Sequence, residues 1–335
     1  ILDPVLKDPQ NNFYSFWLYC RGFTAPIFFT VTGWIVYFLL LKNTTQGLRN
    51  PRIKKGLKRG VELILWGYLL RLNLPLLLLR QINNSFLKPD VLQIIGLGLI
   101  FTVSMYALFY FLKKGIAVLF LGISLLIFLM QPLYFDVTFN QLPSFLAAYL
   151  TKANGAVFYI FPWLGYVSFG AFIAVIFGPQ PRRFLIKSLV FAVLGILLVY
   201  KSSGFLVWIY DQTGWIIFNQ VAYNNFLFIR LGDVFLLVAG FMILNNFFSK
   251  GFWIWIGQKT LSIYIVHYFI LYGSIFGLGI YQYFKYSGSI LQSAVGALSF
   301  MSLCLVITYF VHQYRSRIFF ILWSKFKIKQ TPPYN

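Results

Sequence analysis

The feature that most constrains this chain is a succession of apolar segments, each approaching the length needed to cross a lipid bilayer. A hydrocarbon core about 30 Å thick requires about 20 residues of apolar helix. Of the 335 residues, 59% are hydrophobic and only 10% are charged, whereas a soluble domain is ~45–50% apolar and ~25% charged. The sequence therefore predicts an all-α polytopic integral membrane protein. Its nine candidate spans are residues 22–41, 60–79, 91–112, 115–131, 156–178, 184–200, 226–248, 261–281 and 289–311.

The distribution of charge predicts how these spans are oriented. The formal net charge is +21, from 28 Lys and Arg against 7 Asp and Glu, which in a soluble protein would indicate nucleic-acid binding. When the loops are assigned alternately to two sides, most of the basic residues fall on one side and most of the acids on the other. The basic loops are 42–59, 113–114, 179–187, 249–260 and 312–335. Because Lys and Arg accumulate in cytoplasmic loops, we expect the N-terminus outside, the C-terminus in the cytoplasm and no nucleic-acid partner.

The same assignment predicts the organisation of the chain. We expect an extracytoplasmic N-terminal segment at 1–14, a single transmembrane domain at 15–311 and a basic cytoplasmic tail at 312–335. Two long outer loops, 132–155 and 201–225, are apolar or rich in aromatic residues, as in segments that lie at the membrane interface. They either anchor the protein or form a wall over an outward-facing site. Since the chain starts at Ile1 without an initiator Met, we expect a signal peptide or a further helix upstream, and we favour the helix.

Ionisable residues inside the apolar segments are the first candidates for a functional site, because each costs at least ~2.5–3.5 kcal/mol within the bilayer. Arg71 lies ten residues beyond Val61, about 15 Å along the helix and near the midplane. Arg230 and Asp233 are three residues apart on one face of the seventh segment. They either neutralise each other, or Asp233 is the counter-charge of Arg71. Both interpretations are open at this stage.

Three further charged residues, Arg21, Arg80 and Asp90, stand at the outer ends of the first three segments. Singly they are typical of a membrane interface, but together with Arg230 and Asp233 they indicate a polar substrate pocket in the outer half. Glu62 is different, because it lies three residues after Arg59 and a helical ion pair accounts for it.

The histidines and cysteines give weaker signals. His267 lies about 9 Å inside the eighth segment beside aromatic residues, where it either packs by hydrogen bonding or transfers protons. The two His and two Cys form no cluster with metal-ligand spacing, so no metal site is predicted. The residues alone leave an integral membrane enzyme, a transporter and a structural subunit as alternatives.

Five motifs in order add a family resemblance that extends over residues 13–311. The chain resembles the transmembrane acyltransferase superfamily, in particular bacterial relatives of heparan-alpha-glucosaminide N-acetyltransferase. The motifs are RGFTAPIFFTVTGW (21–34), LKRGVELILWGYLLRL (57–72), DVLQIIGLGLI (90–100), FPWLGYVSFGAFI (161–173) and IGQKTLSIYIVHYFILYG (256–273). The sequence departs from the family pattern at one point. Some relatives have a His four residues before the Pro of the first motif, where this chain has Gly22, and no His precedes His267.

The resemblance implies ten or eleven helices, and transfer of an acetyl group from cytosolic acetyl-CoA to a sugar on the far side of the membrane. It implies catalytic roles for His267, Arg71 and Asp233. The acceptor is expected beside Arg21, Arg80, Asp90 and Arg230, and the CoA phosphates beside Lys54, Lys55, Lys58 and Arg59.

Our leading hypothesis is an acetyl-CoA-dependent acyltransferase of the bacterial inner membrane that modifies a cell-envelope glycan or a lipid-linked sugar among membrane lipids. The first alternative is a catalytically inactive subunit of a larger envelope complex. The second is a transporter or flippase of a polar or lipidic solute, for which the inverted internal repeats of many such folds are not detected.

Overall fold

The computed structural model describes residues 10–81, 86–113, 115–178, 184–285 and 288–328. Every element of regular secondary structure in these ranges is a helix, so the predicted all-α class is confirmed. The described chain divides into two compact units, although the sequence suggested one domain over 15–311. The larger unit contains residues 10–72 and 79–248, and the smaller contains residues 73–78 with those from 249 onward.

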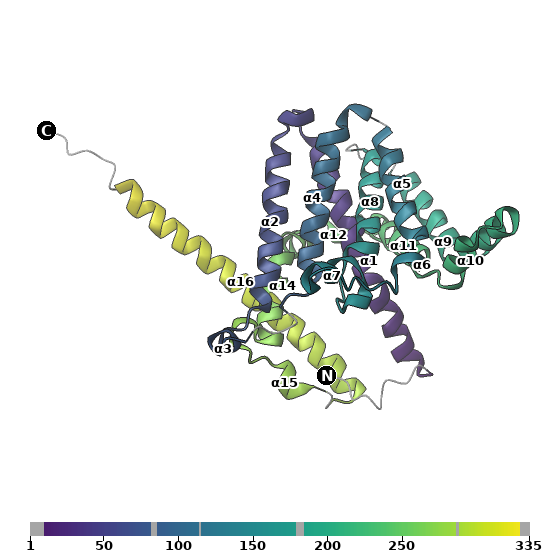
Figure 1. The fold of residues 1–335 in the computed structure, drawn as a ribbon. Helices are drawn as coiled ribbons and strands as arrows, with labels where there is room; N and C mark the ends of the chain where they lie inside the picture. The colour runs from purple at the N-terminus through teal and green to yellow at the C-terminus, as the bar shows by residue number, and fades with distance from the viewer. Residues whose placement is uncertain (1–9, 82–85, 114, 179–183, 286–287, 329–335) are drawn as a thin grey trace. The chain divides into compact units, whose positions relative to one another are not determined.

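The larger unit contains the long helices that position the candidate site, with α2, α4, α1 and α8 side by side (Figure 1). Its helices are α1 (Asn12–Lys42), η2 (Gly47–Arg49), α2 (Pro51–Arg71), α4 (Val91–Phe109), η3 (Tyr110–Leu112), α5 (Gly115–Leu129), α6 (Gln131–Tyr134), α7 (Ser144–Leu150), η4 (Lys152–Asn154), α8 (Ile160–Phe177), α9 (Phe184–Thr213), α10 (Ile216–Tyr223), α11 (Phe226–Ile243) and α12 (Asn245–Phe248).

Glycines set the distance between the helices that pack most closely in this unit. A methyl group on Gly96 of α4 would lie 2.5 Å from the carbonyl oxygen of Gly60 in α2. A methyl group on Gly195 of α9 would lie 2.9 Å from the carbonyl oxygen of Gly232 in α11, and one on Gly33 of α1 would lie 1.9 Å from a backbone oxygen of α8. In lipid, where apolar side chains gain little by association, such small residues let helices pack through their backbones.

Aromatic side chains fill the core between these helices. Phe29 of α1 is fully buried and stacks on Trp163 of α8, with 5.1 Å between ring centroids. Phe128 of α5 lies 4.8 Å from the buried ring of Tyr166 in α8. The core therefore fixes α8 between α1 and α5.

The smaller unit contains α3 (Leu74–Leu78), α13 (Gly251–Gln258), α14 (Thr260–Tyr272), η5 (Ser274–Phe276), α15 (Tyr281–Phe284) and α16 (Ile290–Ile328). The apolar stretch from α13 through η5 is bent by 64° at the break between α13 and α14. Helix α14 packs against α16, and Trp255 of α13 lies 6.0 Å from Tyr309 of α16 between ring centroids.

Six helices in the described part of the chain are long and apolar enough to span a membrane, or seven if the bent pair is one span. The predicted count of nine is not confirmed. Three predicted spans lack such a single helix: α5 has only 15 residues, α2 is too rich in basic residues, and the span at 261–281 falls in the bent pair. The six are Asn12–Lys42, Val91–Leu112, Ile160–Phe177, Leu185–Thr213, Phe226–Ile243 and Ile290–Tyr314.

Three predicted boundaries differ from the structure. The span predicted at 60–79 is wrong, because α2 ends at Arg71; in a continuous helix Pro75 could not donate to the carbonyl of Arg71. Residues 201–213, predicted as part of an interfacial loop, continue α9 until Gly214, whose φ of 71° ends the helix. Helix α16 runs to residue 328, past the predicted start of the tail at 312.

Some predictions concern residues that the structure does not describe. They are the first nine residues of the N-terminal segment 1–14, Lys114, Arg182 and Arg183 of two basic loops, and residues 329–335 of the tail.

Candidate functional site

The charged residues predicted to share one pocket lie in two clusters of the larger unit. We name the first the Arg71 cluster (Tyr68, Arg71, Asp90 and Tyr149) and the second the Arg230 cluster (Tyr19, Gly22, Arg230 and Asp233). Each cluster joins residues of different helices through tertiary packing, although Arg230 and Asp233, and likewise Tyr68 and Arg71, are neighbours on one helix.

In the Arg71 cluster, the last residue of α2 meets the first turn of α4. Arg71 Nη2 lies 3.2 Å from Asp90 Oδ2, and Arg71 Nη1 donates to the backbone oxygen of Lys88 at 2.7 Å. Asp90 also caps α4, because its Oδ1 accepts from the backbone N–H of Val91 and the Gln93 side chain accepts from the backbone N–H of Asp90. Both charged side chains are mostly buried, with 18% and 17% exposed, so the two helix ends fix the ion pair.

Two tyrosines complete this cluster. The Tyr68 hydroxyl, one turn before Arg71, lies 2.7 Å from the hydroxyl of Tyr149 in α7. Burial raises the pKa of Tyr149, the hydrogen bond to Tyr68 raises this pKa further, and the Arg71 guanidinium acts in the opposite direction. Tyr149 is therefore a neutral phenol near pH 7. Since α7 belongs to segment 132–155, this contact brings part of the predicted wall against α2.

A groove of about 400 Å³ lies along α2 and ends at this cluster. Its residues extend from Glu62 to Leu72, a rise of about 15 Å. Phe86 forms the other side, with its ring centroid 5.7 Å from that of Tyr68. The groove is mostly apolar, and its lining residues are Glu62, Leu65, Trp66, Tyr68, Leu69, Leu72 and Phe86.

The four basic residues assigned to CoA lie in the first half of α2. Lys54, Lys55, Lys58 and Arg59 are all exposed, and Arg59 lies 3.3 Å from Glu62, so the predicted ion pair is confirmed. The start of α2 is held by Asn50, which is only 2% exposed. The Asn50 Oδ1 accepts from Arg52 N at 3.0 Å, and its Nδ2 donates to the backbone oxygen of Leu40 at 3.0 Å. The basic stretch is therefore presented on a fixed helix end.

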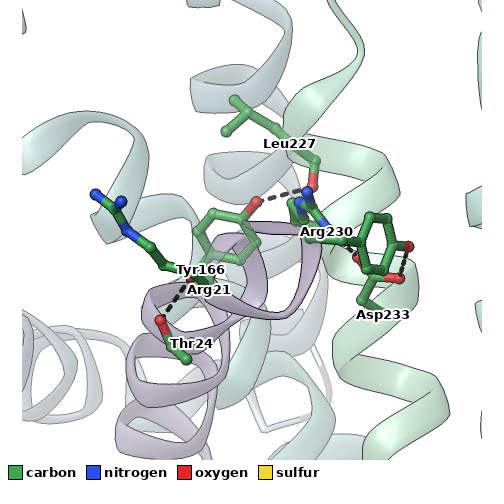
Figure 2. A network of polar contacts seen from close by, with 7 residues as sticks. Arg21, Thr24, Tyr166, Leu227, Arg230 and Asp233 are labelled. Carbon is green, nitrogen blue, oxygen red and sulfur yellow. Dashed lines mark hydrogen bonds and ion pairs between the residues drawn. The ribbon is translucent and has the colours of Figure 1, made fainter. Parts of the chain in front are cut away.

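In the Arg230 cluster, Asp233 receives two donors. Arg230 Nη1 donates to Asp233 Oδ2 at 2.9 Å (Figure 2), and the Tyr19 hydroxyl donates to Asp233 Oδ1 at 2.6 Å. The guanidinium also lies over the Tyr19 ring, 4.2 Å from its centroid. Of the two interpretations of Asp233, the pairing with Arg230 is confirmed, and Arg71 has Asp90 as its counter-charge.

Gly22 makes room for the Arg230 guanidinium. A methyl group on Gly22 would lie 2.6 Å from Arg230 Nη2 and 2.8 Å from Cζ. The neighbouring Arg21 is exposed and points away from Arg230 and Asp233 in Figure 2, with its guanidinium 5.7 Å from the centroid of the Trp17 ring. This role of Tyr19 was not predicted from the sequence. A signal was present, since Tyr19 and Gly22 are three residues apart and share a helix face.

The remaining predicted residues lie outside both clusters. Arg80 is exposed in the turn after α3, with a φ of 57°. His267 lies in α14 of the smaller unit, where its ring is 4.8 Å from that of Tyr264 and 6.3 Å from that of Tyr268. Across the part of the chain that the structure describes, no three His, Cys, Asp or Glu residues are grouped as metal ligands would be.

Comparison with known proteins identifies the family to which the chain belongs. Residues 5–212, more than half of the chain, match the family described as heparan-alpha-glucosaminide N-acetyltransferase, catalytic. No curated protein and no solved structure matches the chain. The match covers both clusters' residues in α1, α2, α4 and α7, and it confirms the resemblance carried by the sequence motifs. The chain belongs to the heparan-alpha-glucosaminide N-acetyltransferase catalytic family.

Proposed function

We propose that this protein is a multi-pass membrane acetyltransferase of the bacterial inner membrane. It transfers the acetyl group of cytosolic acetyl-CoA to an amine or hydroxyl of a glycan or lipid-linked sugar on the extracytoplasmic side. Membership of the family supports the reaction class, since the family uses acetyl-CoA. The basic loops of the sequence support this orientation, with the first half of α2 in the cytoplasm.

One observation carries the proposal: the groove along α2 begins at Glu62, which pairs with the exposed Arg59, and includes Tyr68 of the Arg71 cluster. Acetyl-CoA has a phosphate-rich head and a thin arm that ends in the reactive thioester. Lys54, Lys55, Lys58 and Arg59 are suited to the phosphates, because cations form strong charge-assisted hydrogen bonds with them. The groove starts at Glu62, one turn beyond Lys58, and its apolar wall suits the arm. The thioester then reaches the level of Tyr68 and Arg71.

The chemistry assigned to the Arg71 cluster is acyl transfer. The acceptor nitrogen or oxygen attacks the thioester carbonyl carbon, a C–N or C–O bond forms, and the C–S bond breaks as the CoA thiol leaves with a proton. In the tetrahedral intermediate between these two steps the carbonyl oxygen carries negative charge, and the Arg71 guanidinium is suited to stabilise this charge. Asp90 and the Lys88 carbonyl orient this guanidinium. The sequence also assigned catalytic roles to His267 and Asp233; of these, Asp233 accepts from Arg230 and Tyr19 in the Arg230 cluster.

The test is acetyl transfer by the purified full-length chain in lipid nanodiscs, with radiolabelled acetyl-CoA and glucosamine-terminated glycans as acceptors. We expect labelled product from the wild type and a loss of about 100-fold in kcat for Arg71→Gln. The matched control is Lys201→Gln, which removes an exposed cation of α9 and leaves kcat unchanged. Absence of both product and free CoA with the wild type, or full activity of Arg71→Gln, would overturn the proposal.

A further inference from the structure

The Arg230 guanidinium has more hydrogen-bond donors than the surrounding protein satisfies. A guanidinium carries five N–H donors. Nη1 donates to Asp233, whereas Nε and Nη2 donate to no acceptor among the described residues. Neither of these two nitrogens is fully buried. Arg71 differs, because two of its nitrogens bond separately to Asp90 and Lys88.

The surroundings of Arg230 hold the guanidinium in place without using its donors. It lies 4.2 Å from the ring centroid of Tyr19 and 5.3 Å from that of Phe226, and its Nη2 faces the bare Cα of Gly22. Only 13% of the Arg230 side chain is exposed. Aromatic faces attract a cation but accept no conventional N–H···O bond. In apolar surroundings, donors without acceptors cost several kcal/mol, so an acceptor from outside the described protein is expected there.

Exposed aromatic residues near the cluster indicate its level in the membrane. Trp17 and Tyr19 on α1 are 48% and 43% exposed, and Tyr14 stacks on Trp17 with 5.7 Å between centroids. Tyr200 of α9, which packs against α11, is 76% exposed. Trp and Tyr concentrate at the level of the lipid headgroups, where phosphate is the abundant anion.

We propose that Arg230, held by Asp233, Tyr19 and Gly22, binds the oxyanion of a phosphate ester through its Nε and Nη2. The guanidinium edge matches two phosphate oxygens, as it does in bidentate arginine–phosphate pairs. This assignment rests on the proposed function in one respect: it makes the acceptor a phosphate-bearing, lipid-linked sugar. Binding itself does not depend on acetyl transfer and is measured without it.

Binding is tested on the purified full-length chain in a neutral detergent. The probes are inorganic phosphate, glycerol 1-phosphate and dioctanoyl phosphatidylglycerol, with dioctanoylglycerol as the matched lipid that lacks phosphate. The readouts are the adduct mass in native mass spectrometry and the shift of the unfolding midpoint, since a ligand that binds only the folded state stabilises it. We expect binding of at least one phosphate probe and none of dioctanoylglycerol. A response to the soluble phosphates assigns the site to a free phosphate group, and a response to the phospholipid alone assigns it to a lipid headgroup.

Gly22→Ala is the decisive variant, because it removes no charge. The new methyl group displaces the flexible end of Arg230, so the fold is kept while the two nitrogens move. We expect the dissociation constant for phosphate to rise about tenfold. Gly204→Ala is the matched control, since a methyl group there meets nothing within 4 Å. The double variant Arg230→Gln, Asp233→Asn keeps the pair neutral and is expected to abolish binding.

Two results would overturn the inference. One is that no phosphate probe binds the wild type. The other is that binding persists unchanged in both Gly22→Ala and the double variant while both remain folded. If the phosphate probes bind as expected but acetyl transfer is absent, the phosphate site stands and the proposed function fails.

Discussion

Replacing Asp90 by Asn and by Ala separates the two roles that this residue has in the structure. Asp90 caps α4 through the N–H of Val91 at 2.8 Å and pairs with Arg71 at 3.2 Å. Asn and Asp are equally good helix caps, so Asp90→Asn loses only the charge pair. Because both side chains retain 17–18% exposure, the loss is below that of a fully buried pair, about 2 kcal/mol in the free energy of unfolding. Asp90→Ala also loses the cap, which adds about 1 kcal/mol.

The pair itself is measured by a double-mutant cycle of Asp90→Asn and Arg71→Gln. We expect the double variant to be more stable than the sum of the two single effects predicts, by about 1–2 kcal/mol, because neither charge is then left unpaired. The free energy of unfolding is followed by tryptophan fluorescence in detergent micelles, with Asp211→Asn as the control at an exposed acid. Additive effects in the cycle would show that the ion pair has no energetic role, and equal losses for Asn and Ala at position 90 would show that the cap has none.

Three further predictions follow from other contacts. Gly96→Ala is expected to destabilise the protein by about 1–3 kcal/mol, because its methyl group meets a backbone oxygen of α2, whereas Gly122→Ala has space; thermal unfolding compares the two. The raised pKa of Tyr149 stabilises the folded state below the ordinary tyrosine pKa of 10.0, and this contribution is lost as the pH rises towards the folded-state pKa. Stability is therefore expected to fall more steeply above pH 10 in the wild type than in Tyr149→Phe, and an equal slope would contradict this. Tyr106→Phe removes the hydroxyl that accepts from Asn50 Nδ2 at 3.3 Å, and is expected to increase proteolysis of the loop before α2.

Apolar segment length predicted much of the fold, because the cost of exposing backbone polar groups to lipid forces long apolar stretches into helices. Six of the predicted spans correspond to helices that meet the length and hydropathy needed to cross a membrane. Where this signal failed, other local effects determined the helix ends: Pro75 prevents α2 from continuing, and Gly214 ends α9 well beyond the predicted boundary. Hydropathy contains little information about either effect.

Ion-pair partners that are close in sequence were also predictable, whereas ion-pair partners that are distant in sequence were not. Arg59–Glu62 and Arg230–Asp233 are spaced three residues apart on one helix, so helical geometry alone brings each pair together. The partner of Arg71 depends on where α4 starts relative to the end of α2. A sequence gives the depth of a residue along a helix, but it does not give the direction in which neighbouring helices lie. Depth alone made Asp233 a suitable counter-charge for Arg71, and the packing of α2 against α4 selected Asp90 instead.

This pairing of charges changes which residues are candidates for binding and catalysis. In each of the two ion pairs the opposite charges neutralise one another. Net charge therefore no longer distinguishes a binding site from a structural contact. The distinction comes from donors and acceptors that remain after each pair has formed. Arg71 has its carboxylate partner and a backbone carbonyl, and the groove along α2 adjoins its cluster at Tyr68. Arg230 has one carboxylate, two aromatic faces and a glycine, which hold the guanidinium but leave two nitrogens to donate. The two clusters are therefore suited to different tasks, stabilisation of a developing oxyanion at Arg71 and recognition of a pre-existing anion at Arg230.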